Sequence, residues 1–266
     1  MKFADTHAHL DVFVKNSTLQ TVIERAVEAG VDKIITCSTN SDEWILYESL
    51  AKEFSGNIFW QIGIHPSEIK DGDDIALDAI GAFFTSENPP VAIGEIGMDF
   101  YHKPADLDEF ERIKIRQKEI FLRQLEISKA FENTKICVHA RDCVRECISA
   151  IEEAGIDFSR VVLHCFSGSK KEICEINERG ARASFTGIIT YKNADEMREC
   201  MLAQGLDKLM FETDCPYLAP APLRGKTNEP ANIPLIAKAA ATIFDIPQEK
   251  IAQIAYENSC NFFGLK

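Results

Sequence analysis

The chain has 266 residues, of which 45% are hydrophobic and 27% are charged, as is typical of a globular protein with a large core. Its formal net charge of −13 argues against a protein that coats nucleic acid through a broad basic surface. This negative charge does not exclude an enzyme that binds one or two phosphates, because bound metal ions can supply positive charge locally. No run of about 18 apolar residues occurs, so we expect no membrane-spanning helix and no membrane partner.

The nine cysteines are odd in number and scattered along the chain, and no two of them form a C-x-x-C pair. Several lie in apolar stretches such as "KICVHA" and "VVLHCF". We therefore expect buried free thiols in a reducing compartment, hence a cytoplasmic protein, with access to the nucleus if the source is eukaryotic. The N-terminus has no basic region before an apolar stretch, so no secretory signal is expected.

Short apolar stretches alternate with helical patterns along the whole chain. The stretches that predict buried strands are 2–7, 33–38, 57–65, 90–97, 134–140, 160–166, 181–187 and 208–214. The helical patterns between and after them are 17–30, 41–54, 108–131, 142–155, 169–180, 193–205, 232–244 and 247–264. The first of these begins on a Ser/Thr cap and ends on Gly30, and Ser41 is the expected cap of the second.

This alternation predicts a parallel sheet with helices outside it. About eight strand–helix units in roughly 250 residues is the size of a (β/α)8 TIM barrel, which is the fold we expect. An open Rossmann-like sheet is the alternative, but no G-x-G-x-x-G motif follows the first strand. No linker, repeat or low-complexity segment interrupts the chain, so residues 1–266 are predicted to form a single domain.

Most of the predicted strands end in a residue that can bind a metal ion. These residues are His7, His9, His65, Glu95, His139, His164 and Asp214. In a TIM barrel the ends of the strands converge on the carboxyl-terminal face, where active sites lie. Burying so many imidazoles together with two carboxylates would be costly without a cation, so the sequence predicts a metal centre.

The number of candidate ligands is sufficient for two metal ions. His7 and His9 are two positions apart on a strand and so face the same way. We expect the first ion to be bound by His7, His9, Glu95 and Asp214, and the second by His139, His164 and the second oxygen of Glu95. Imidazole and carboxylate ligands suit divalent ions, and this ligand set is compatible with zinc, manganese, magnesium, cobalt or nickel. Two such ions about 4 Å apart would activate a water molecule.

Seven motifs in this order resemble those of the TatD family of metal-dependent deoxyribonucleases, which belongs to the amidohydrolase superfamily of TIM barrels. The motifs are "DTHAHLD", "IGIHP", "AIGEIGMDFY", "VHAR", "HCFSG", "ETDCPYLAP" and "RGKTNEP". The resemblance runs from Asp5 to the C-terminal "ENSCNFFG". It implies a divalent-metal hydrolase that cleaves phosphodiester bonds in DNA, often as a 3′ to 5′ exonuclease, through a metal-activated water.

The resemblance implies the same six metal ligands and adds catalytic roles. Glu95 would bridge the two ions, and Asp214 would both bind metal and orient or deprotonate the water. His65 would lie near the scissile phosphate rather than ligate. The stretch "GMDFY" departs slightly from the more usual Leu-Asp-Tyr-Tyr, and Ala8 stands where a cysteine is common. Ala8 should not touch the metal, because its side chain points away from the ligand face.

Two arginines are candidates for binding substrate. Arg141 is two residues past His139 and shares its face if the strand continues that far. Arg224 lies in the loop after the last predicted strand, where it either approaches the substrate or stabilises the loop. His102 follows the fourth predicted strand at some distance from its end, and we expect a loop residue there rather than a ligand.

Three functions remain open from the sequence. The leading hypothesis is a monomeric two-metal deoxyribonuclease that acts on DNA ends or single strands. A second is an amidohydrolase-type enzyme that uses the same centre on an amide, ester or lactone. A third is a catalytically inactive barrel that serves as a binding protein.

Overall fold

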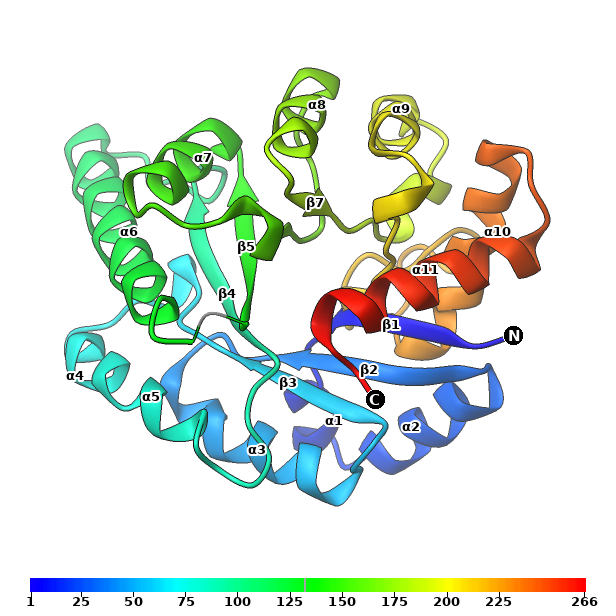
Figure 1. The fold of residues 1–266 in the computed structure, drawn as a ribbon, viewed down its shortest axis with the longest axis horizontal. Helices are drawn as coiled ribbons and strands as arrows, with labels where there is room; N and C mark the ends of the chain where they lie inside the picture. Colours follow the sequence, from blue (N-terminus) through cyan, green and yellow to red (C-terminus); the bar gives the residue numbers. More distant parts are fainter. Residues whose placement is uncertain (132) are drawn as a thin grey trace.

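The computed structural model describes residues 1–131 and 133–266, and it shows a TIM barrel (Figure 1). Seven parallel strands pair in chain order to form a curled sheet, and the helices surround it. The strands are β1 (Phe3–Ala8), β2 (Val31–Cys37), β3 (Ile58–Ile62), β4 (Ala92–Asp99), β5 (Lys135–Arg141), β6 (Val161–Leu163) and β7 (Arg182–Ala183). The predicted fold class is therefore confirmed, and the alternative of an open Rossmann-like sheet is wrong.

The eighth predicted strand, 208–214, is not a regular strand, and the sequence prediction was wrong on this point. Two isolated parallel bridges replace it, and they join Phe185 to Phe211 and Ala8 to Cys215. The backbone N–H of Asp214 also donates to the carbonyl of His7 at 3.0 Å. The segment thus connects β7 to β1 and closes the ring with fewer backbone hydrogen bonds than a full ladder has.

The helices lie on the outside of the ring (Figure 1). They are α1 (Asp11–Lys15), α2 (Leu19–Glu28), α3 (Trp44–Glu53), α4 (Asp73–Asp78), α5 (Ile80–Phe83), α6 (Leu107–Ser128), α7 (Val144–Glu153), α8 (Lys170–Glu178), α9 (Asp195–Gln204), α10 (Ile233–Phe244) and α11 (Gln248–Phe263). The short helices α1, α4 and α5 were not predicted. Ser41 is not a cap either, because the side chain of Asn40 accepts the capping hydrogen bond and Ser41 begins a 3₁₀ turn.

The C-terminal tail covers the amino-terminal end of the barrel. Phe262, Phe263 and Leu265 are buried in one apolar cluster with residues from β2, β4, β5 and β6. Lys135 and Arg182, the first residues of β5 and β7, lie over the ring of Phe262 at 5.2 and 4.2 Å. The tail therefore packs against the amino ends of these strands, away from the carboxyl ends on which the predicted ligands lie.

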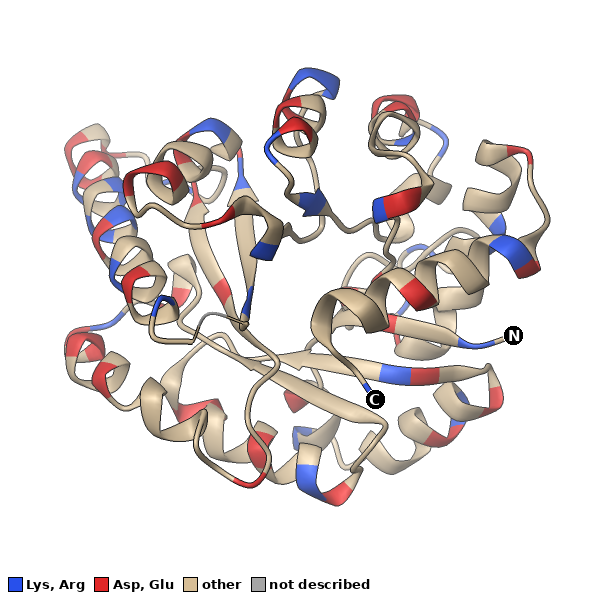
Figure 2. Ribbon diagram, viewed as in Figure 1, with Lys and Arg blue, Asp and Glu red and all other residues tan. Residues whose placement is uncertain are grey.

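Charged residues are distributed over the outer helices, where acidic and basic residues are intermingled (Figure 2). All nine cysteines are free thiols, and seven of them are buried, as the sequence predicted. No helix in the described ranges is long and apolar enough to cross a membrane.

Candidate metal centre

The six predicted ligands converge at the carboxyl ends of the strands. They come from β1 and β6 or the residue directly after each, from β4 and β5, and from the segment that closes the ring: His7, His9, Glu95, His139, His164 and Asp214. All six side chains belong to buried residues. Residues separated by some two hundred positions thus meet at one place, as strand ends in a barrel must.

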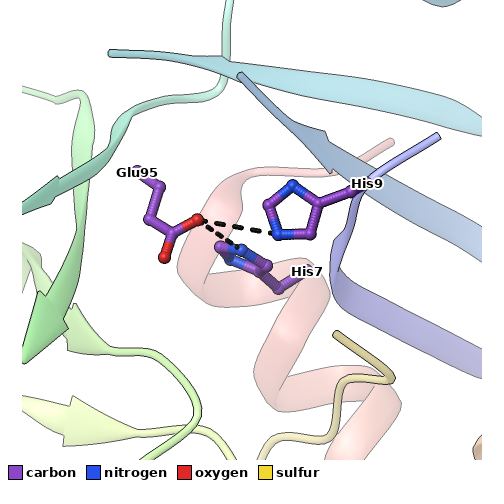
Figure 3. A group of neighbouring side chains, drawn as sticks. All are labelled: His7, His9 and Glu95. Atoms are coloured by element: carbon purple, nitrogen blue, oxygen red, sulfur yellow. Dashed lines mark hydrogen bonds and ion pairs between the residues drawn. The ribbon is translucent and has the colours of Figure 1, made fainter. Parts of the chain in front are cut away.

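The first group of ligand atoms surrounds one oxygen of Glu95. Glu95 Oε2 lies 3.1 Å from His7 Nε2 and 3.7 Å from His9 Nε2 (Figure 3). Asp214 Oδ1 lies 3.3 Å from His9 Nε2 and 4.0 Å from His7 Nε2. Ligand atoms about 2.1 Å from a shared ion lie roughly 3 to 4 Å apart. The spacing of this group therefore fits one divalent ion.

The second group surrounds the other oxygen of Glu95. Glu95 Oε1 lies 2.7 Å from His139 Nδ1 and 2.6 Å from His164 Nε2. These are hydrogen-bond distances, so an ion between the three atoms requires them to separate by about half an ångström. The two Glu95 oxygens thus face different imidazole groups, which is the arrangement of a carboxylate that can bridge two ions.

His65 lies closer to the second group than the resemblance implies. Its Nε2 is 3.3 Å from Glu95 Oε1, and its ring centroid is 4.3 Å from that of His139. The ligand atoms of His65, Glu95 and His139 lie within 4.8 Å of one another, close enough to hold an ion. His65 also lines the cavity, so its position fits both a ligand and a residue beside the substrate.

The backbone of β4 explains how Glu95 reaches the centre. β4 pairs with β5 through Ile93↔Ile136 and Ile96↔Val138, so β4 has one residue more than its partner between these pairs. Such a bulge redirects a side chain, here that of Glu95. Gly97, two residues after Glu95, has φ +143, and a Cβ there would lie 2.0 Å from the carbonyl oxygen of His139. The close approach of β5 to β4 at this position therefore requires the second glycine of the motif "GEIG".

Three buried polar residues that the sequence did not predict lie beside the ligand rings. Asp99 Oδ2 lies 3.0 Å from His139 Nε2, and Glu212 Oε1 lies 3.5 Å from His164 Nδ1. Gln61 Nε2 lies 3.5 Å from the Nδ1 of His7. Groups of this kind fix the orientation and tautomer of a ligating histidine. The spacing gave a signal for Glu212, because it is two residues before Asp214.

Asp5 ties the first strand to the segment that closes the ring. Its Oδ1 accepts the backbone N–H of Thr213 at 2.9 Å, and its Oδ2 accepts the hydroxyl of Thr213 at 2.5 Å. Burial outweighs these hydrogen bonds and raises the pKa of Asp5 to about 8. This contact sets His7 and Asp214 beside each other, because they are the near neighbours of Asp5 and Thr213.

The charges of the centre favour a cation. Burial opposes ionisation of Glu95, but His164, His65 and His7 outweigh it and hold the pKa of Glu95 well below its usual value. The pKa of Asp214 is also lowered, because the hydrogen bond from His9 outweighs the effect of burial. Both carboxylates are therefore ionised at neutral pH.

The imidazoles divide into two kinds. Burial lowers the pKa of His65 to about 4 and lowers that of His7. For His9 burial acts in the same direction, but the hydrogen bond to Asp214 and the charge of Glu95 raise its pKa to about 9. Glu95 and Glu212 likewise outweigh burial and raise the pKa of His164 well above its usual value. Without an ion, His9 and His164 thus carry the compensating positive charge.

The centre forms the floor of a cavity of about 580 Å³. Arg141 lines this cavity and is the only Lys or Arg among its lining residues in the described part of the chain. Its guanidinium lies against Cys165, with Nη2 3.6 Å from the sulfur. Arg224 does not line the cavity, since it is exposed and its guanidinium lies 4.5 Å from the ring centre of Tyr191. Stabilisation of its own loop is the role that this position fits.

Comparison with known proteins identifies the family. A family model described as "TatD related DNase" matches residues 4–264. The chain belongs to the TatD family. Among its relatives, the metal-dependent hydrolase YabD of Bacillus subtilis is 33% identical over 98% of both chains. The metal-dependent hydrolase YcfH of Escherichia coli is 30% identical over 100% of this chain and 97% of its own length.

Solved structures of TatD proteins have the same fold. The TatD homologue YJJV of Escherichia coli K12 superposes with a TM-score of 0.88 at 26% identity, over 99% of this chain and 98% of its own. A phosphotriesterase homology protein of Escherichia coli, with phosphate in its active site, shares the fold alone, with a TM-score of 0.68, 15% identity and 98% of each chain covered. The resemblance drawn from the seven motifs is therefore confirmed at the level of family and fold.

Proposed function

We propose that this TatD-family chain is a divalent-metal-dependent hydrolase with two metal ions, and that it cleaves phosphodiester bonds at DNA ends. The observation that carries the proposal is the position of Glu95, whose two carboxylate oxygens face different groups of imidazoles. Such a carboxylate suits a centre with two adjacent ions, which stabilise both the attacking and the leaving oxygen of a phosphoryl group. The names of the relatives support a metal-dependent hydrolase, and the description of the family model as a DNase is in line with a nucleic-acid substrate.

The residues present fit such a pair of ions. His7, His9 and Asp214 would hold the first together with Glu95 Oε2. His139 and His164 would hold the second together with Glu95 Oε1. Bound divalent ions would lower the pKa of a water molecule and neutralise charge on the phosphoryl oxygens.

The protein's own residues would orient the reaction. Asp214 Oδ1 lies beside His9 and is ionised, so it can accept the proton of the attacking water. His65 lines the cavity next to the centre, and there it would contact the phosphate. Cys165, Asp214 and Glu95 raise the pKa of the Arg141 guanidinium. Arg141 therefore stays protonated and would add a positive charge beside the phosphoryl group.

The size of the cavity supports a substrate that enters by its end. About 580 Å³ is the volume of a pocket for one small ligand, not of a groove for a duplex. With a net charge of −13, the chain has no general excess of cations to attract the DNA backbone. A terminal nucleotide of a single strand fits both observations.

A second candidate is hydrolysis of an amide, ester or lactone. The acidic net charge favours it over DNA, and a metal centre of this composition can polarise a carbonyl group. An inactive binding protein is the third possibility, and the complete set of buried ligands speaks against it.

The test is a nuclease assay on end-labelled single-stranded and double-stranded DNA across a series of divalent ions, with a chelator control. We expect metal-dependent release of nucleotides that the variant Glu95→Gln lacks. Glu87→Gln is the matched control, because Glu87 is exposed and remote from the centre. Full activity of Glu95→Gln would overturn the proposal. Turnover of small amides or esters, without turnover of DNA, would favour the second candidate.

A further inference from the structure

The loop after β4 carries a histidine that the metal centre does not use. His102 lines the cavity, and its side chain is 68% exposed. Its ring is nevertheless held in place, because its Nδ1 lies 2.9 Å from Asp99 Oδ2. Its backbone N–H also donates to Asp99 Oδ1 at 2.9 Å. The buried Asp99 carboxylate thus anchors both the loop and the ring.

The same carboxylate connects His102 to the metal centre. Asp99 Oδ2 lies 3.0 Å from His139 Nε2, and His139 Nδ1 lies 2.7 Å from Glu95 Oε1. One oxygen of Asp99 therefore orients a ring of the centre and a ring of the cavity wall together. With Nδ1 engaged by Asp99, the nitrogen that His102 can offer to a ligand is Nε2.

Cleavage of a phosphodiester is faster when the leaving oxygen receives a proton, since a nucleoside alkoxide is a poor leaving group. Among the other lining residues, Tyr217 is a weak donor, because burial and Asp214 raise the pKa of its phenol. Arg141 keeps its proton and faces Cys165. The Nε2 of His102 makes no hydrogen bond with any described residue, and imidazole is the side chain that most often serves as a general acid.

We propose that His102 is the proton donor to the leaving group, an inference that rests on the proposed phosphodiesterase function. The oxygen of water forms a bond to phosphorus, and Asp214 accepts a proton from that water. The bond from phosphorus to the leaving oxygen breaks, and its electron pair takes the proton from His102 Nε2. Exchange of protons with solvent returns His102 and Asp214 to their starting states. Asp99 holds the ring throughout and is a positioning residue.

Two substrates that differ only in the leaving group test this role. Thymidine 5′-(p-nitrophenyl phosphate) and the dinucleotide TpT both yield thymidine 5′-phosphate when the bond to the aryl group or to the 3′-oxygen is hydrolysed. The p-nitrophenolate leaves without a proton, whereas the nucleoside needs one. We expect His102→Gln to lower kcat on TpT by about 10²-fold and to change kcat on the aryl ester by no more than a few-fold.

The control is Lys103→Ala, which alters an exposed neighbour in the same loop and should change neither rate. Metal content and melting temperature of each variant show that the centre and the fold are intact. An equal loss on both substrates, or no loss on TpT, would overturn the role of His102 and leave the proposed function standing. If the wild-type protein cleaves only the aryl ester, His102 does not supply a proton to a nucleoside leaving group, and the proposal is overturned. If it cleaves neither, the proposed function fails and the role of His102 fails with it.

Discussion

Binding of metal ions should release protons, and the number released follows from which ligand imidazoles are charged in the metal-free protein. In the metal-free protein the pKa of His9 is raised to about 9 and that of His164 is raised well above its usual value, so both rings are charged at pH 7. His7 and His65 have lowered pKa values and are neutral there. A ligating imidazole must give up its proton to the solvent. We therefore expect the release of about two protons when two ions bind at pH 7.

The assay is isothermal titration calorimetry of the chelator-treated protein in buffers that differ in their enthalpy of ionisation. The slope of the observed enthalpy against the ionisation enthalpy gives the number of protons released. The affinity for the first ion should rise with pH up to about 9, by roughly tenfold per pH unit for one proton, because His9 then loses its proton without help from the metal. The variant His9→Gln should release about one proton fewer.

A slope of zero, or an affinity that does not change between pH 6.5 and 9, would refute this reasoning. Either result would mean that His9 and His164 are already neutral in the metal-free protein, or that they are not ligands. The exposed His102, which is outside the metal centre, supplies the control, since His102→Gln should leave the number of released protons unchanged.

Three further predictions follow from single contacts. Asp99→Asn should weaken binding of the second ion by about 10- to 100-fold, measured by competition with a metallochromic chelator, and unchanged affinity would show that Asp99 does not orient His139. Gly97→Ala should lower the free energy of unfolding by about 3 kcal/mol or more, because a Cβ at φ +143 meets the His139 carbonyl; an unchanged urea midpoint would contradict this. Asp5 has a pKa of about 8 in the folded protein against 3.8 for an unperturbed aspartate, so its burial costs stability increasingly as pH rises from 3.8 to 8. Asp5→Asn should thus gain stability relative to wild type with rising pH, by roughly 2 to 4 kcal/mol at pH 7 in chelator-treated protein, and a pH-independent difference would argue against the raised pKa.

The sequence predicted the barrel and the convergence of the ligands for one reason. In a parallel barrel the residue at the carboxyl end of each strand must lie on one face, so position in the chain is enough to bring His7 near Asp214. The polar residues beside the ligand rings are harder to predict from the sequence. Gln61 meets His7 across the barrel interior, and nothing in the local pattern of β3 indicates that contact.

Other features depend on geometry that a linear pattern does not contain. The bulge that directs Glu95 follows from the pairing of β4 with β5, which is known only once the strands are in register. The segment 208–214 looks like a strand, yet bonds from Thr213 to Asp5 replace part of its ladder. The helices α4 and α5 span only Asp73–Asp78 and Ile80–Phe83, too short for a helical period to stand out.

The central claim is that Glu95 bridges two metal ions, and a crystal of the protein grown with Mn²⁺ tests it most directly. Anomalous difference density should show two ions about 4 Å apart, each contacting a different oxygen of Glu95. A single ion, or two ions of which neither contacts Glu95, would contradict the account.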